Sequence, residues 1–288
     1  MSRETPARDL LAGGCRDDRV TGTVYLVGAG PGATDLLTLR AACLLERADI
    51  VFHDALVPPG ILALASKAKL VEVGKRSGRH STAQNFINKR LVDAAREFQA
   101  VVRLKGGDPM LFGRAHEELS YLKSKNINFE IVPGVTAAFA ASADLGVSLT
   151  ARGLARSVAF LTTRAAAGER ANEWVKVALA ADTVVIYMGA GEAEVIAQAL
   201  IGAGKPPATP VAVVEHASLP GVRKLSGTLE QLPALVARCG NGPAAILMGE
   251  VYRDVAVSQI IASWPSQHLF SSPTARATRS GRGRSSSS

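Results

Sequence analysis

Short apolar runs alternate with amphipathic segments along most of the chain. Residues 23–28 are almost wholly apolar, as expected for a strand that is buried on both faces. Residues 35–47 then carry apolar side chains at helical spacing, with Cys43 expected on the buried face. Strand, turn and helix follow one another again downstream, and this order is typical of the α/β class.

The same pattern predicts the remaining elements. Strands are expected at residues 23–28, 49–52, 70–73, 101–105, 128–132, 157–162, 183–187, 210–215, 222–227 and 244–248. Helices are expected at residues 35–47, 82–98, 114–125, 172–179, 192–200 and 228–236. Small residues after Pro133-Gly134 predict one more helix, packed very close to a strand or a ligand.

The pattern restarts after residues 146–153, which we interpret as a linker. We therefore expect a disordered leader at 1–20 and α/β domains at 21–148 and 149–264. A disordered Ser/Arg/Gly-rich tail is expected at 265–288. Two successive α/β units imply two lobes with a cleft between them.

Composition narrows the class of protein. The chain has 288 residues, of which 47% are hydrophobic, so it can bury a sizeable core. No apolar run is long enough for a membrane helix and the N-terminus has no signal core, so we expect a cytoplasmic protein. The three cysteines are far apart in sequence, which argues against a zinc site or a disulfide framework.

The formal net charge is +8. Arg276, Arg279, Arg282 and Arg284 of the tail supply half of it. A basic tail of this kind could touch nucleic acid, but a solvated tail is the preferred interpretation. The remaining positive charge suits an acidic small-molecule substrate without identifying one.

The sequence VRLKGGDP at residues 102–109 is the most informative stretch. An apolar strand that carries Arg103 and Lys105 stops at two glycines, which allow a ligand to approach the backbone closely. Asp108 follows and offers a carboxylate that accepts hydrogen bonds. Ligands of open α/β sheets bind where strands end, so we expect a binding loop here.

Two other loops carry polar or glycine-rich sequences after strands. Residues 28–32 read GAGPG, which lacks the GxGxxG spacing of a dinucleotide site but keeps a nicotinamide-dependent oxidoreductase as an alternative. Asp54 stands after the next strand, where a ribose-binding acid could sit. The basic loop at 74–80 either clamps carboxylates or is simply solvated.

Six motifs in order resemble the uroporphyrinogen-III C-methyltransferases of the tetrapyrrole methylase family. They are VGAGPG at 27–32, VGKR at 73–76, VRLKGGDP at 102–109, FGR at 112–114, VPGVTAA at 132–138 and YMG at 187–189. The resemblance spans about residues 23–263. It implies two α/β domains with the donor in the cleft, usually in a homodimer. It also implies S-adenosyl-L-methionine-dependent methylation of two pyrrole carbons of uroporphyrinogen III, which gives precorrin-2 for siroheme or cobalamin, with S-adenosyl-L-homocysteine released.

The resemblance assigns roles residue by residue. Asp54 matches the proposed proton acceptor and Lys75 the proposed proton donor. The donor-binding positions are Pro31, Gly106, Gly107, Asp108, Leu111, Thr136, Ala137, Met188 and Ala217. Candidate partners for the substrate carboxylates, each of which could equally be a surface residue, are Arg76, Arg79, Arg114 and Arg152. No metal is required.

The chain departs from the family pattern at several positions. His53 stands where Tyr is frequent, Ala115-His116 replaces Gly-Gly, and Ala151 replaces a His. Ala217 stands where the bacterial enzymes have glycine. These positions bear on substrate details and rate more than on donor binding. The quoted sequence lacks the dehydrogenase and ferrochelatase module of some bacterial enzymes, so a stand-alone methyltransferase is expected.

Three alternatives remain at this point. A methyltransferase of the same fold could act on a later corrin precursor. A nicotinamide-dependent oxidoreductase would bind its cofactor at residues 28–32. A non-enzymatic nucleic-acid-binding protein would rely on the tail arginines, although we expect neither nucleic acid nor a membrane as a partner.

Overall fold

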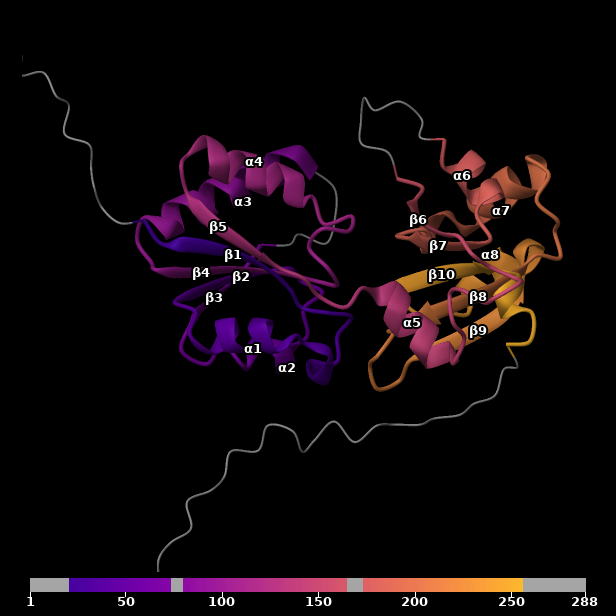
Figure 1. Cartoon of the computed structure of the whole chain (residues 1–288), viewed down its shortest axis with the longest axis horizontal. Helices are drawn as coiled ribbons and strands as arrows, with labels where there is room; N and C mark the ends of the chain where they lie inside the picture. The colour runs from indigo at the N-terminus through magenta and orange to yellow at the C-terminus, as the bar shows by residue number, and fades with distance from the viewer. Residues whose placement is uncertain (1–20, 74–79, 165–172, 256–288) are drawn as a thin grey trace, which may run out of the picture.

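The computed structural model describes residues 21–73, 80–164 and 173–255. The predicted leader and basic tail lie outside these ranges, and so do Lys75, Arg76 and Arg79. The described chain forms two lobes, each built on one five-stranded sheet (Figure 1).

The first sheet is parallel throughout, with the order β3-β2-β4-β1-β5. Its strands are β1 (Thr23–Gly28), β2 (Ile50–His53), β3 (Lys69–Glu72), β4 (Ala100–Lys105) and β5 (Asn128–Val132). Gly28 pairs with Lys105 and His53 with Leu104 in this register. The carboxyl ends of β1, β2 and β4 therefore meet at one edge of the sheet.

Helices cover both faces of the first sheet (Figure 1). On one face lie η1 (Thr34–Leu36), α1 (Leu39–Glu46) and α2 (Pro59–Leu62). On the other lie α3 (His80–Ala95) and α4 (Ala115–Ser124). The predicted helix at 35–47 is thus divided, because Leu37 is extended and Thr38 caps α1 by accepting a hydrogen bond from the Ala41 amide at 3.2 Å. The prediction that Cys43 is buried was wrong, since this side chain is exposed on α1.

The second sheet is mixed, with the order β6-β7-β10-β8-β9. Its strands are β6 (Val158–Thr162), β7 (Thr183–Tyr187), β8 (Pro210–Glu215), β9 (Arg223–Thr228) and β10 (Ala244–Gly249). Only β6 and β7 pair in parallel. The other pairs are antiparallel, so the second lobe does not repeat the topology of the first.

Two helical layers cover the second sheet. The apolar core on one face includes α6 (Trp174–Ala180), α7 (Ala193–Gly202) and α8 (Leu232–Ala237). The short turns η2 (Ala190–Glu192), η3 (Leu229–Gln231) and η4 (Glu250–Tyr252) complete this lobe. The other face is covered by α5 (Ala137–Leu145), whose Ala138, Ala140 and Ala141 pack on Val185, Ala212 and Leu247. These small side chains confirm the expected close packing of the helix after Pro133-Gly134.

The packing of α5 bears on the domain boundary. The helix precedes the expected division at residue 148, yet its buried side chains belong to the core of the second sheet. The division stays a prediction, and this packing favours a boundary near Thr136.

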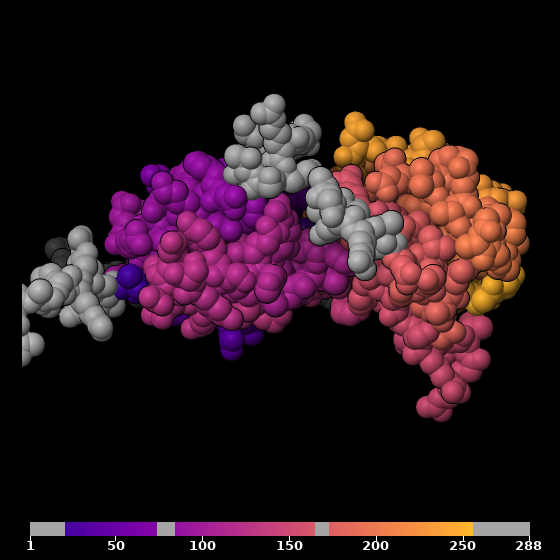
Figure 2. Space-filling view, turned by 90° about the horizontal axis from the view of Figure 1, so that it is seen from above, coloured from indigo at the N-terminus to yellow at the C-terminus, as the bar shows by residue number. Residues whose placement is uncertain are grey.

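Past α5 an exposed turn bridges Ala151 and Ala155. In Figure 2 the segment coloured for residues near 150 protrudes from the second lobe. No helix in the described ranges is long and apolar enough to cross a membrane.

Candidate functional site

Glycine backbones from β1, β4 and β5 meet at the end of the first sheet. Gly107 donates to the Gly30 carbonyl at 2.8 Å and accepts from the Gly30 amide at 3.2 Å. A Cβ on Gly28 would lie only 2.7 Å from both the Gly107 carbonyl oxygen and the Gly134 amide nitrogen. Gly107 also has a φ of +67°, whereas Gly106 is exposed with open space around it. Gly107 therefore builds the loop, and Gly106 leaves its backbone accessible to a ligand.

Asp108 joins the loops that follow β4 and β5. Its Oδ1 accepts a hydrogen bond from the Met110 amide at 2.8 Å, and its Oδ2 accepts one from the Gly134 amide at 2.9 Å. Each carboxylate oxygen keeps a further lone pair for a hydroxyl or ammonium group. Asp108 thus shapes the loop and still presents a negative charge at its surface.

Asp54 lies just after β2, with about a third of its side chain exposed. Its Oδ1 accepts a hydrogen bond from Arg103 Nη2 at 2.6 Å. Its own amide donates to the Leu104 carbonyl at 3.3 Å. The structure therefore holds the predicted proton acceptor from the neighbouring strand β4.

Behind Asp54 lies a buried charged cluster that sequence reasoning missed. Arg103 Nε and Lys105 Nζ both contact the Glu118 carboxylate, at 3.1 Å and 3.0 Å, and Gln84 donates to it at 3.1 Å. Arg103, Lys105 and Glu118 are each at most 3% exposed. The signal was present in the sequence, because two cations on a strand buried on both faces require buried partners.

The cluster shifts the pKa values of its cations in opposite directions. Burial alone lowers the pKa of Arg103, but the Asp54 and Glu118 carboxylates outweigh burial and hold that pKa above its usual value. Burial, followed by the neighbouring Arg103 charge, holds the pKa of Lys105 below its usual value, although Glu118 opposes both. Arg103 is therefore the permanent cation beside Asp54.

A tyrosine at the end of β7 connects the lobes. The Tyr187 hydroxyl shares a 2.6 Å hydrogen bond with Thr136 Oγ1 and accepts one from the Ala138 amide at 3.2 Å. It thereby satisfies a free amide in the first turn of α5. Its ring lies 5.3 Å from that of Phe112 on the loop after β4. Burial raises the pKa of Tyr187, so the hydroxyl keeps its proton at neutral pH.

The Gly-rich loop after β1 is also held by the second lobe. The Ala33 amide donates to Ser218 Oγ at 3.1 Å, and the Ser218 amide donates to Asp144 Oδ2 at 2.7 Å. A Cβ on Gly32 would come within 2.9 Å of Leu219. The loop after β8 therefore closes directly over the GAGPG turn.

Strained backbone gathers on these same loops. Non-glycine residues with positive φ follow β4, β7 and β8: Phe112 (52°), Arg114 (55°), Met188 (57°), His216 (56°) and Ser218 (68°). Asn126 at the end of α4 is the other one in the described ranges. Such conformations cost free energy and concentrate at binding and catalytic sites.

The predicted donor residues come from loops that these contacts join. Pro31, Gly106, Gly107, Asp108 and Leu111 lie on the loops after β1 and β4, and Thr136 and Ala137 begin α5. Met188 is 42% exposed after β7, and Ala217 is buried after β8 between two residues of positive φ. Thr136–Tyr187, Phe112–Tyr187 and Ala33–Ser218 are among the contacts that connect the loops.

The predicted substrate arginines in the described ranges are placed differently. Arg114 is the residue before α4, makes no capping hydrogen bond with its side chain, and donates from Nε to Glu117 Oε1 at 2.6 Å. That hydrogen bond raises the pKa of Arg114 and lowers the pKa of Glu117. Arg152 lies in the exposed turn after α5, and no described contact joins it to the donor loops.

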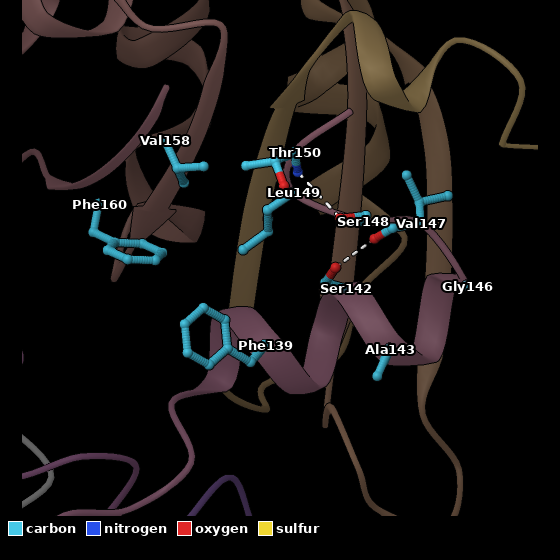
Figure 3. Close-up of a pocket in the computed structure, with 10 residues that line it drawn as sticks. All are labelled: Phe139, Ser142, Ala143, Gly146, Val147, Ser148, Leu149, Thr150, Val158 and Phe160. Atoms are coloured by element: carbon cyan, nitrogen blue, oxygen red, sulfur yellow. Dashed lines mark hydrogen bonds between the residues drawn. The ribbon is translucent and has the colours of Figure 1, made fainter. Parts of the chain in front are cut away.

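A cavity of about 610 Å³ opens beside these loops, between α5, the segment that follows it, and β6 (Figure 3). Phe139 and Phe160 face it and form an edge contact with ring centroids 6.1 Å apart. Phe160 in turn contacts Tyr187 at 6.2 Å, so the cavity adjoins the predicted donor site. Its lining is apolar with three hydroxyls and no cation, which does not suit a carboxylate-rich ligand. Within the described ranges, no three His, Cys, Asp or Glu side chains gather as metal ligands.

The family model for tetrapyrrole (corrin/porphyrin) methylases matches residues 23–233. The siroheme synthase of Zymomonas mobilis is 44% identical over 237 residues, which cover 82% of this chain and 50% of that protein. The siroheme synthase of Chromobacterium violaceum is 44% identical over 252 residues, which cover 87% of this chain and 53% of that protein. The chain thus spans about half the length of the curated relatives it matches.

Solved structures agree in fold over nearly their full length. The uroporphyrin-III C-methyltransferase of Thermus thermophilus in complex with S-adenosyl homocysteine aligns with a TM-score of 0.71 at 40% identity, covering 81% of this chain and 99% of that one. A cobalt precorrin-4 methyltransferase aligns with a TM-score of 0.70 at 29% identity, covering 79% of this chain and 94% of that one. With its two-sheet fold and joined strand-end loops, the chain belongs to the tetrapyrrole (corrin/porphyrin) methylase family.

Proposed function

We propose that this chain transfers methyl groups from S-adenosyl-L-methionine to two pyrrole carbons of uroporphyrinogen III. The products are precorrin-2, a precursor of siroheme and cobalamin, and S-adenosyl-L-homocysteine. The observation that carries the proposal is the joining of the predicted donor loops across the lobes by the Phe112–Tyr187 ring contact and the Ala33–Ser218 hydrogen bond. The 40% identity to a uroporphyrin-III C-methyltransferase over 99% of its chain supports the choice of substrate.

The residues between the lobes fit a donor of this chemistry. An ammonium or ribose hydroxyl suits the Asp108 carboxylate, and an adenine ring suits exposed backbone beside Met188 and the buried Ala217. Gly106 is exposed with open space, so a ligand can reach its backbone. The donor carries no phosphate, which explains why GAGPG need not follow the GxGxxG pattern. We propose that Pro31, Gly107, Leu111, Thr136 and Ala137 complete the donor site.

When bound, the donor supplies a methyl group that is already activated on a sulfonium sulfur. A carbon–carbon bond forms as the carbon–sulfur bond breaks, the sulfur keeps the bonding pair, and the pyrrole loses a proton. The protein must align the pyrrole carbon with the methyl group. We propose that Asp54 accepts the proton, because its carboxylate is held rigidly while part of it stays exposed. Lys75 remains the predicted proton donor outside the described residues.

The substrate carboxylates need cationic partners. We propose Arg114 at the start of α4 for this role because it follows the strained Phe112 on the loop after β4. Its guanidinium already binds both oxygens of the Glu117 carboxylate, at 2.6 Å and 2.7 Å, so its geometry suits a carboxylate partner. Arg152 is proposed with weaker support, and Arg76 and Arg79 stay predictions.

We further propose a homodimer. In the described part of the second sheet β6 is an edge strand whose residues are all half-buried, and Phe139, whose ring contacts Phe160 on β6, is 53% exposed. Unpaired strand edges with exposed apolar side chains favour association. Light scattering of the purified chain should give twice the monomer mass.

A cytoplasmic location stays a prediction from the sequence, as does the absence of nucleic-acid and membrane partners.

A related methyltransferase activity on a later corrin precursor is the second candidate. The likeness to cobalt precorrin-4 methyltransferase supports it less, because identity falls from 40% to 29% at a similar TM-score. Membership of the methylase family leaves the oxidoreductase alternative without support.

An anaerobic incubation with S-adenosyl-L-methionine and uroporphyrinogen III, followed by mass analysis of the tetrapyrrole, tests the proposal. Two added methyl groups are expected. One added methyl would limit the activity to a single transfer and make the altered positions His53, Ala115, His116 and Ala151 the first to revert. An unchanged tetrapyrrole, with S-adenosyl-L-homocysteine still bound in a parallel titration, would refute the proposal that uroporphyrinogen III is the substrate.

A further inference from the structure

Four charged side chains form one chain of contacts behind the predicted proton acceptor. Asp54 pairs with Arg103, Arg103 with Glu118, and Glu118 with Lys105. The Asp54 end is 32% exposed, and the other three groups are nearly fully buried. Signs alternate along the chain of contacts, so the charges cancel in total.

Stability alone does not account for this arrangement. Burying ion pairs costs several kcal/mol of desolvation per charge, and apolar residues of similar volume often stabilise a fold more. The positions beside Arg103 on β4 are apolar, namely Val101, Val102 and Leu104, and all are fully buried. An apolar residue at position 103 would therefore suit the core.

The pairing also assigns Arg103 to Asp54. Lys105 Nζ already contacts both Glu118 oxygens, at 3.1 Å and 3.0 Å, and so balances that carboxylate. The positive charge of Arg103 is then left for Asp54. The short 2.6 Å contact between Arg103 Nη2 and Asp54 Oδ1 agrees with this division.

Arg103 itself is fixed on three sides. Its Nε donates to Glu118 at 3.1 Å, its Nη1 donates to the Leu104 carbonyl at 3.2 Å, and its Nη2 donates to Asp54. Asp54 Oδ2, by contrast, accepts no hydrogen bond from any residue in the described ranges. Within the described ranges, one oxygen of this partly exposed carboxylate is therefore held by Arg103 and the other has no hydrogen-bond donor.

We propose that Arg103, locked by Glu118, is a positioning residue that orients Asp54 so that Oδ2 accepts the proton of the methylated pyrrole. The proposal rests on the proposed function. In the step itself the carbon–sulfur bond breaks, the sulfur keeps its electron pair, and the pyrrole proton moves to Asp54 Oδ2. Arg103 touches neither substrate nor donor, and acts by holding the carboxylate in one rotamer before the substrate arrives.

A double-mutant cycle with R103K and D54A separates this role from a structural one. R103K keeps the charge but loses the fork that spans two carboxylates. We expect roughly a 10- to 100-fold loss of turnover from R103K, with affinity for S-adenosyl-L-homocysteine within about threefold of wild type. In the D54A background, R103K should lower turnover less than about twofold, because Arg103 would have no carboxylate to orient.

Single-turnover assays with a radiolabelled methyl group keep the slow variants measurable. R96K, an arginine-to-lysine change at an exposed site near the end of α3, is the matched control and should leave turnover unchanged. If R103K fails to fold, E118Q replaces it in the same cycle, because it frees the guanidinium that Glu118 locks.

The outcomes are distinct. Equal fold-losses from R103K in both backgrounds, or a matching loss of S-adenosyl-L-homocysteine affinity, would overturn the positioning role and leave the proposed function standing. A wild-type chain that binds S-adenosyl-L-homocysteine but never methylates uroporphyrinogen III would refute the proposed function, and the positioning proposal with it.

Discussion

Two regions of the molecule, the carboxyl end of β2 and the loops that join the lobes, differ in their chemistry. The end of β2 is charged, with Asp54 backed by the buried Arg103 and Glu118. The seam between the lobes is formed by the loops after β1, β4, β7 and β8 and the start of α5. Neutral hydrogen bonds and ring contacts join these loops, and several of their residues have strained backbone conformations. The charged groups at the end of β2 suit proton transfer, and the exposed backbone of the seam suits binding of the methyl donor. Variants of the two regions should therefore separate turnover from donor affinity.

The largest effect is expected from D54A. Loss of the proton acceptor should lower turnover about 10²- to 10⁴-fold, the range of general base catalysis. Affinity for S-adenosyl-L-homocysteine should stay within about threefold, because within the described ranges the Asp54 carboxylate is hydrogen-bonded to Arg103 on β4 rather than to the donor loops. Steady-state assays and calorimetric titration of the same preparation measure both quantities. Equal losses in turnover and affinity would show that Asp54 is structural.

D108A should lower the affinity for S-adenosyl-L-homocysteine, in contrast to D54A, which should lower turnover. Removing the carboxylate leaves the Met110 and Gly134 amides without their acceptor and deprives the donor of a charged partner. Hydrogen bonds to charged groups contribute about 1.5–3 kcal/mol, so binding of S-adenosyl-L-homocysteine should weaken roughly 10- to 100-fold. D93A, which removes an exposed aspartate on α3, serves as the control. Unchanged affinity in D108A would contradict the donor assignment.

Y187F tests the seam with a single-atom change. The variant removes the hydroxyl that holds Thr136 and Ala138 but keeps the ring beside Phe112. A neutral hydrogen bond contributes about 0.5–1.5 kcal/mol, so donor affinity should fall roughly 3- to 10-fold while turnover at saturating donor is retained. Y121F, on α4, is the matched control. A loss of turnover without a loss of donor affinity would contradict the idea that the seam determines donor binding.

The smallest effect concerns the exposed Arg114–Glu117 pair. The hydrogen bond from Arg114 lowers the pKa of Glu117, so this stabilisation is present above the ordinary carboxyl pKa and is lost as pH falls through the lowered value. At pH 7, E117Q should cost at most about 1 kcal/mol of unfolding free energy, and once the pH falls below the lowered pKa of Glu117 the two proteins should melt alike. Thermal melts across this pH range measure the difference. A gap that widened toward low pH would exclude the pair as its cause.

Much of the fold was predictable because strand signals are local. The bounds of β1, β5, β7 and β8 match the predicted strands at both ends. β1, β7 and β8 are largely buried and mostly apolar, whereas β5 alternates exposed and more buried residues; both patterns mark a strand within a few residues. The mixed pairing of the second sheet was not predictable, because strand direction depends on partners that are distant in sequence.

The site was predictable only in part for the same reason. The motif GGDP marked the loop after β4, but nothing near Asp108 in sequence reveals that Gly134 is its partner. Tyr187 was noted only as part of a motif, since its contact with Thr136 joins residues 51 positions apart. Cys43 shows the opposite failure, where helical spacing suggested burial and the structure leaves the side chain exposed. The roles of the predicted site residues stay proposals.

A crystal structure with S-adenosyl-L-homocysteine bound tests the central claim most directly. The account predicts the ligand in the seam, in contact with the loop of Asp108 on the first lobe and with Met188 and Ala217 on the second, and its sulfur on the side of Asp54. Density confined to the apolar cavity beside Phe139 and Phe160, or to one lobe alone, would contradict it.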